Sequence, residues 1–177
     1  MSDTLITVVA ILLAAILMFV FPLMSVAERT DDMSSLSVQT ATTEFVDNSR
    51  AVGKITLDNY QKLVSTLQAT GNTYDIEIEI KILDENVGKK SAWTSGTVIG
   101  ENIYYSVYTA QIMEVLTAEN GTSTYNMSEG DIISVSVKNT NKTMAQTIRG
   151  AFYSISGKDT YQISAQHSGI VTATGSN

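Results

Sequence analysis

Three acidic side chains recur at every second position of one short segment, and they are the strongest candidates for chemistry in the chain. Asp75, Glu77 and Glu79 alternate with apolar residues, and this spacing places neighbouring carboxylates about 7 Å apart on one face of a strand. Carboxylates so arranged suit a divalent cation or an acid–base pair. Alternating acids on an exposed strand also keep a sheet soluble and discourage edge pairing, and we favour this interpretation. The pattern therefore predicts neither a metal site nor a catalytic residue.

Other side chains that often carry catalysis are scarce. The single histidine, His167, lies in a polar segment that reads as a loop, with no acidic residue close to it in sequence, and such a histidine is seldom a catalytic base. The chain has no cysteine, which excludes disulfides, thiolate metal sites and cysteine nucleophiles. No glycine-rich loop joins a strand to a helix as in a phosphate site. We therefore expect a protein that is not an enzyme and that holds no cofactor.

The charge balance argues against nucleic acid as a partner. The 177 residues include 18 Asp and Glu against 11 Lys and Arg, which gives a net charge of −7. A protein that binds phosphate backbones gathers basic side chains on one face, and the densest basic cluster here is the pair Lys89-Lys90. That pair is most simply a solvated turn.

The apolar periodicity predicts a small α+β domain. Strict alternation predicts strands over 74–82, 132–137 and 160–165, with a further strand near 170–171. Spacing of three and four predicts a helix from about 56 to Gly71, one from Tyr104 to Leu116, and a short one in which Met144, Ile148 and Phe152 share a face. Because the alternate strand residues are polar, we expect helices on one face of an antiparallel or mixed sheet and solvent on the other.

An uncharged segment from Thr4 to Ala27 precedes this domain. A helix needs roughly 20 apolar residues to cross a hydrocarbon core about 30 Å thick, so the segment is long enough to span a membrane. Pro22, the single proline, predicts a helix kink near the outer leaflet. The residues expected to form the membrane anchor are Leu5, Ile6, Val9, Leu12, Leu13, Ile16, Phe19, Phe21 and Pro22.

Two interpretations of this segment remain open, a retained anchor and a cleaved secretory signal. Small residues in Ser25-Val26-Ala27 suit cleavage after Ala27. The absence of a basic residue in Met1-Ser2-Asp3 and the length of the apolar run favour retention. We favour a single-pass cell-membrane protein with a short N-terminus inside and its bulk extracytoplasmic, although basic flanking residues give little guidance on orientation.

The segment after the anchor carries an apolar stripe at helical spacing, formed by Val38, Ala41, Phe45 and Val52. This stripe is expected to pack on neighbouring subunits or on the sheet. A continuous helix from Thr4 to Val52 would be about 73 Å long and would form a stalk. The chain then divides into residues 1–30 as anchor or signal, 31–53 as amphipathic stalk helix, and 54–177 as the extracytoplasmic domain.

An N-terminal apolar helix, an amphipathic continuation and a small helix-on-sheet domain resemble the type IV pilins and their minor-pilin relatives. The segments 71–78 and 130–143 further resemble small membrane-anchored proteins of anaerobic Firmicutes associated with tight-adherence (Tad) pilus gene clusters. The resemblance implies a structural or accessory subunit of a pilus or related secretion apparatus. Its partners would be the membrane, further copies of itself or other subunits of the apparatus, and assembled copies would form a surface filament.

Two other classes of function remain as alternatives. An anchored binding or sensor domain would recognise a small ligand or a wall polymer through the loops around Trp93 and His167. A surface hydrolase would use Glu77 and Glu79 as its acid–base pair.

Overall fold

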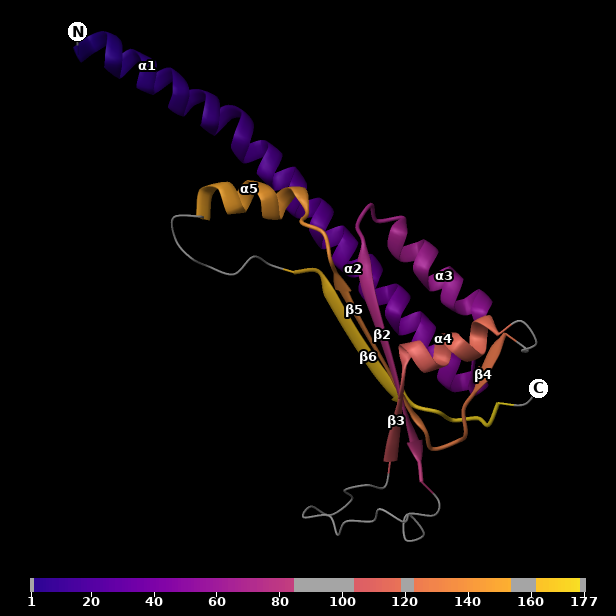
Figure 1. Ribbon diagram of the computed structural model, residues 1–177. Coiled ribbons are helices and arrows are strands. Elements are labelled where there is room, and N and C mark those ends of the chain that lie inside the picture. Colours follow the sequence, from indigo (N-terminus) through magenta and orange to yellow (C-terminus); the bar gives the residue numbers. More distant parts are fainter. Residues whose placement is uncertain (1, 85–103, 119–122, 154–161, 176–177) are drawn as a thin grey trace, which may run out of the picture.

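The computed structural model describes residues 2–84, 104–118, 123–153 and 162–175 (Figure 1). A single long helix leads into an α+β domain built on a four-stranded sheet. The loop predicted over 84–100, with Trp93, lies almost wholly outside the described residues, and so do residues 154–161.

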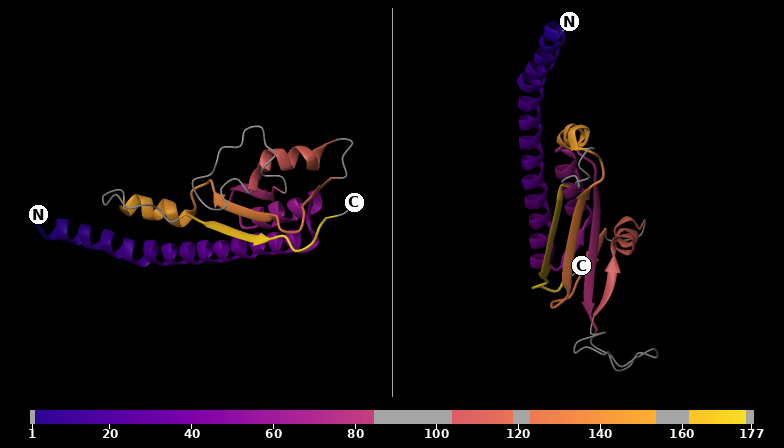
Figure 2. Two further views of the ribbon diagram at one scale, coloured as in Figure 1. Left: turned by 90° about the horizontal axis from the view of Figure 1, so that it is seen from below. Right: turned by 90° about the vertical axis from the view of Figure 1, so that its left-hand side faces the viewer.

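The long helix consists of α1 (Ser2–Ala15), a π-helical turn η1 (Ile16–Val20) and α2 (Phe21–Val52) without interruption. At 1.5 Å per residue, the 50 residues from Asp3 to Val52 extend about 75 Å. The predicted anchor and the predicted amphipathic segment are therefore parts of one continuous helix. Figure 2 shows that this helix is bowed, with its convex side away from the domain.

The π-helical turn lies immediately before Pro22 and has a local cause. Proline has no amide hydrogen to donate, and its ring clashes with the carbonyl four residues back. Widening the preceding turn relieves that clash, and π-helical turns and prolines are among the usual causes of bent helices. The distortion predicted at Pro22 takes this form.

The main sheet has the strand order β3-β2-β5-β6, and every neighbouring pair is antiparallel. Its strands are β2 (Tyr74–Leu83), β3 (Tyr104–Tyr108), β5 (Ile132–Asn139) and β6 (Ser164–Ile170). A second, two-stranded sheet pairs β1 (Lys54–Thr56) with β4 (Thr124–Asn126). The alternation seen in the sequence sets the register of the central strands, since Ile78 faces Val135 and Ile80 faces Ile133 across the ladder.

Three helices share one hydrophobic core with the sheet. They are α2, α3 (Leu57–Gln68) and α4 (Thr109–Thr117), and α5 (Met144–Tyr153) packs on α2 near the far end of the domain. The core cluster joins buried residues of all three helices to the inward side chains of the strands, among them Leu63, Leu67, Ile112, Leu116, Ile78, Ile80, Ile133, Val135 and Val137. The alternate residues on β2 and β5 are mostly exposed or half-buried, as the sequence predicted.

Two of the predicted elements differ in the structure, and the short strands β1 and β4 were not predicted. The helix expected from Tyr104 to Leu116 is strand β3 followed by the shorter helix α4. Its first residues pair with the end of β2, and the Thr109 hydroxyl accepts a hydrogen bond from the Ile78 amide at 2.7 Å. Aromatic and β-branched residues favour a strand where a partner edge is present, and helical spacing of tyrosines could not reveal that edge.

The C-terminal strand also begins later than predicted. Instead of strands over 160–165 and near 170–171, one strand, β6, runs from Ser164 to Ile170 along β5. His167 therefore lies within a strand and not in a loop, opposite Val135. Pairing with β5 sets the limits of β6, because Lys138 lies opposite Ser164 and Ile132 opposite Ile170.

Candidate membrane and assembly helix

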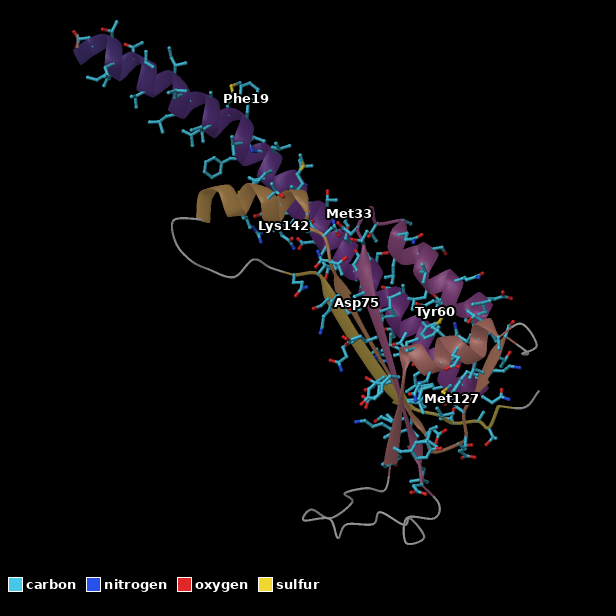
Figure 3. All side chains as sticks on the ribbon, viewed as in Figure 1. Phe19, Met33, Tyr60, Asp75, Met127 and Lys142 are labelled. Carbon is cyan, nitrogen blue, oxygen red and sulfur yellow. The ribbon has the colours of Figure 1, made fainter. Side chains whose placement is uncertain are left out.

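The first half of the long helix has no protein cover. All nine predicted anchor residues are exposed, including Leu12 at 58% and Phe19 at 69%. Figure 3 shows the side chains of this half standing clear of the sheet and of α3 and α4. Among the described residues, this is the one helix that is long and apolar enough to cross a membrane. An apolar surface of this size needs an apolar environment, and a bilayer supplies one.

The second half of the helix binds the domain through the predicted stripe. Val38, Ala41 and Phe45 are buried in the core of their own chain. The stripe was expected to pack on neighbouring subunits or on the sheet, and in the structure it packs on the sheet. Val52 is 52% exposed and does not belong to this buried face.

Among the buried residues of α2 that sequence reasoning missed, Thr42, Val46 and Ser49 are all 0% exposed. Two of them are polar and therefore broke the apolar pattern. The Thr42 hydroxyl donates to the Val38 carbonyl at 2.7 Å, and a satisfied hydroxyl can be buried at little cost. Counting Ser and Thr together with the apolar residues at spacings of three and four would have identified them.

The opposite face of α2 is exposed and, apart from Arg29, largely apolar even beyond the uncharged segment. Val26, Met33 and Leu36 are 61%, 73% and 66% exposed, and helical spacing places them on the side away from the domain. Thr30 and Thr40 lie among them, and their hydroxyls donate to the carbonyls of Val26 and Leu36 at 3.1 and 2.8 Å. We call these five residues the outer stripe. Its two threonines can present their methyl groups, because their hydroxyl hydrogens are already bonded within the helix.

The junction between α2 and α5 is polar and partly buried. The Thr143 hydroxyl donates to Asp31 Oδ2 at 2.6 Å, and both residues are buried. Thr143 also caps α5, because its hydroxyl accepts from the Gln146 amide at 3.2 Å while Gln146 Oε1 accepts from the Thr143 amide at 3.0 Å. One turn further along α5, Arg149 donates through Nε and a terminal nitrogen to Glu28 Oε1 at 3.2 and 2.8 Å.

Thr143→Val should loosen α5 while leaving the rest of the domain folded. The change removes the hydroxyl that caps the helix and the hydrogen bond to the buried Asp31 carboxylate, losses of about 1–3 kcal/mol each. Hydrogen exchange of the α5 amides measures this opening. Thr147→Val is the matched control, because in the part of the chain that the structure describes the hydroxyl of the exposed Thr147 donates to the Thr143 carbonyl at 2.9 Å, in the first turn of α5. Equal exchange in the two variants would contradict the role assigned to Thr143.

The single histidine joins α2 to β6. His167 Nε2 lies 3.6 Å from Asp47 Oδ1, which also accepts from Arg50 Nε at 2.8 Å. The hydrogen bond from Arg50 is the largest influence and lowers the pKa of Asp47 below its ordinary value, with His167 adding to the effect against partial desolvation. The acidic partner is 120 positions away in sequence, so only the fold could reveal it. The geometry is that of a surface salt bridge between two elements.

The three alternating carboxylates lie on the open face of the sheet. Glu79 accepts a hydrogen bond from the Ser106 hydroxyl at 2.7 Å, Asp75 is opposite Lys138, and Glu77 is opposite Ser136. In the part of the chain that the structure describes, no three His, Asp or Glu side chains are grouped to hold a metal ion. Glu79 therefore has a hydrogen-bonded neighbour, and Asp75 and Glu77 are exposed to solvent.

No family model, curated protein or solved structure matches this chain. Function must therefore be argued from the architecture itself.

Proposed function

We propose that the protein is a single-pass, pilin-like structural or accessory subunit of a surface pilus or related secretion apparatus, and not an enzyme. The observation that carries this proposal is the division of one helix into three surfaces. The first half is uncovered and apolar, one face of the second half binds the domain, and the outer stripe on the opposite face is apolar and free of the domain. The domain lies outside the cytoplasm, and the membrane is the first partner.

The membrane dictates how two copies would meet. Copies inserted by the same segment cross in the same direction and to the same depth, so their helices are parallel and their outer stripes lie at the same height. Small or satisfied side chains allow close approach of helices. The exposed Arg29 lies on the same face, three residues after Val26 and four before Met33, and the exposed Asp32 flanks it, so neighbouring helices would bring opposite charges together. The long helix of a second copy of the protein would therefore fit against the outer stripe.

The energy available for this contact is adequate for an assembly held together by a membrane. Burying a Met or Leu side chain fully stabilises by about 1.5–3 kcal/mol, and Met33 and Leu36 are each more than half exposed. Anchoring in two dimensions raises the effective concentration of copies, so a modest contact is enough.

Met33→Glu should abolish contact between copies without unfolding the domain, because it places a charge in the centre of the outer stripe. The chain has no cysteine, so Thr40→Cys gives a single site for disulfide cross-linking in native membranes. We expect cross-linked dimers of the Thr40→Cys protein and their loss when Met33→Glu is added.

The matched control is Gln39→Glu, which adds the same charge at an exposed position off the stripe and should leave cross-linking intact. Cross-linking that survives Met33→Glu would contradict assembly through the stripe. A mature protein that begins at Glu28 and is released into the medium would make the segment a cleaved signal, and would favour the secreted binding domain instead.

A further inference from the structure

Helix α5 lies where the uncharged segment of the long helix ends. Glu28 is the first charged residue after the run from Thr4 to Ala27, and it is the residue that Arg149 of α5 holds. Figure 1 shows α5 beside the long helix at the end of the domain nearest the N-terminus. In the anchored protein proposed above, this is the level of the lipid headgroups.

The contacts of α5 also give its direction. It begins with Thr143 at Asp31 and reaches Glu28 six residues later, at Arg149. It therefore runs toward the apolar half of the long helix. Six residues advance about 9 Å along α5, while Asp31 and Glu28 are about 4.5 Å apart along α2, so α5 lies obliquely across α2. Its last turn, up to Tyr153, comes after the Glu28 contact.

The two sides of α5 differ in character. Ala145 and Gln146 are buried on the side of the domain and α2, whereas Met144 is 61% exposed and Ile148 is half-buried. The sequence pattern adds Phe152 at the next i+4 position. The described residues therefore include an amphipathic helix whose apolar side is exposed at Met144 and half-buried at Ile148.

The charges of this helix suit a lipid surface. No acidic residue occurs from Met144 to Tyr153, although the chain carries a net charge of −7. Its own basic residue, Arg149, is paired with Glu28, and the exposed Lys142 precedes its first turn. Figure 3 shows Lys142 at the start of α5, beside the long helix. Amphipathic helices with basic polar sides lie in the membrane interface with their apolar side among the acyl chains.

We infer that α5 is an interfacial helix, whose Met144 and Ile148 side enters the headgroup and acyl boundary beside the transmembrane segment. This inference depends on the proposed anchoring. The Glu28–Arg149 and Asp31–Thr143 contacts fix the distance between α5 and the transmembrane segment. The protein then meets the membrane at two places. The second place sets the tilt of the domain, and with it the direction in which the outer stripe faces.

Spin labels on single cysteines test this in the full-length protein, reconstituted in phospholipid vesicles. Labels at Met144→Cys, Gln61→Cys and Leu12→Cys report collisions with oxygen, which enriches in lipid, and with a water-soluble nickel chelate. Gln61 is exposed on α3 and serves as the water reference, while Leu12 serves as the lipid reference. We expect the oxygen-to-nickel ratio at Met144 to be several-fold above that at Gln61 and below that at Leu12.

Each other outcome is informative. A ratio at Met144 equal to that at Gln61, with Leu12 in lipid, overturns the inference and leaves the anchor intact. A water-like ratio at Leu12 overturns the anchoring itself. Spectral broadening at Met144 that disappears on dilution with unlabelled protein identifies a second copy as the cover, and also overturns the inference.

Discussion

Replacing Phe45 with Asp should unfold the domain, whereas the exposed apolar half of the long helix takes no part in the core and should be unaffected. Phe45 is 5% exposed and belongs to the single core cluster that α2 shares with α3 and the sheet. Truncating a buried Phe costs about 3–5 kcal/mol, and an unpaired carboxylate in the same place adds the cost of burying a charge. Domains of this size are stable by about 5–15 kcal/mol in total, so the folded state is lost or barely populated.

The measurement is the thermal transition of the full-length protein in detergent, followed by near-ultraviolet circular dichroism. Asn48→Asp is the matched control, because it introduces the same side chain three residues later at an exposed position of the same helix, and its transition should change little. A Phe45→Asp variant that melts like the control, but fails to assemble, would mean that the stripe packs on neighbouring subunits instead.

Local sequence patterns predicted the elements that form in the same way whichever segments lie beside them. The alternation of β2 needs no knowledge of its partners, because every second residue from Tyr74 to Ile82 is apolar whichever strand lies beside it. Helix α3 is similar, since Thr56 caps it by accepting from the Asn59 amide at 3.2 Å, and this is visible as a Thr with an acidic residue soon after. The long helix follows from length and composition alone.

Contacts between distant residues set the features that the sequence did not reveal. Strand β3 exists because the end of β2 offers an edge, and α5 lies on α2 because Thr143 meets Asp31, 112 positions earlier. His167 became an ion-pair partner through Asp47 in the same way. The outer stripe was overlooked for a different reason. Its Thr members break the apolar pattern, although their hydroxyls are satisfied within the helix.

The end of the long helix depends on a glycine that the C-terminal segment crosses. Gly53 caps α2 with a φ of 74°, and its amide donates to the Ser49 carbonyl at 2.9 Å. A Cβ at this position would collide with the Ala173 carbonyl oxygen and would lie 2.6 Å from the Gly175 amide nitrogen. Both obstacles are backbone atoms, so no side-chain rotation can relieve them.

Gly53→Ala should therefore detach the segment after β6 and destabilise the domain by several kcal/mol. The left-handed conformation alone costs an alanine about 1–2 kcal/mol. Moving the segment breaks further bonds, among them Thr172 amide to Arg50 carbonyl at 3.0 Å and Gly175 amide to Met127 carbonyl at 2.9 Å. Fast hydrogen exchange at these amides, together with a large fall in the thermal transition, is the expected result.

Gly71→Ala separates backbone strain from collision. Gly71 has a φ of 79°, nearly that of Gly53, but a Cβ there would meet nothing within 4 Å. Its substitution should cost only the conformational penalty of about 1–2 kcal/mol and leave the C-terminal amides protected. If the two alanine variants had the same thermal transition temperature, the C-terminal segment would not lie across the end of the helix. The packing of the domain against the long helix would then need another explanation. A larger loss in Gly53→Ala alone ties the long helix, the small sheet and the last strand into one cooperative unit.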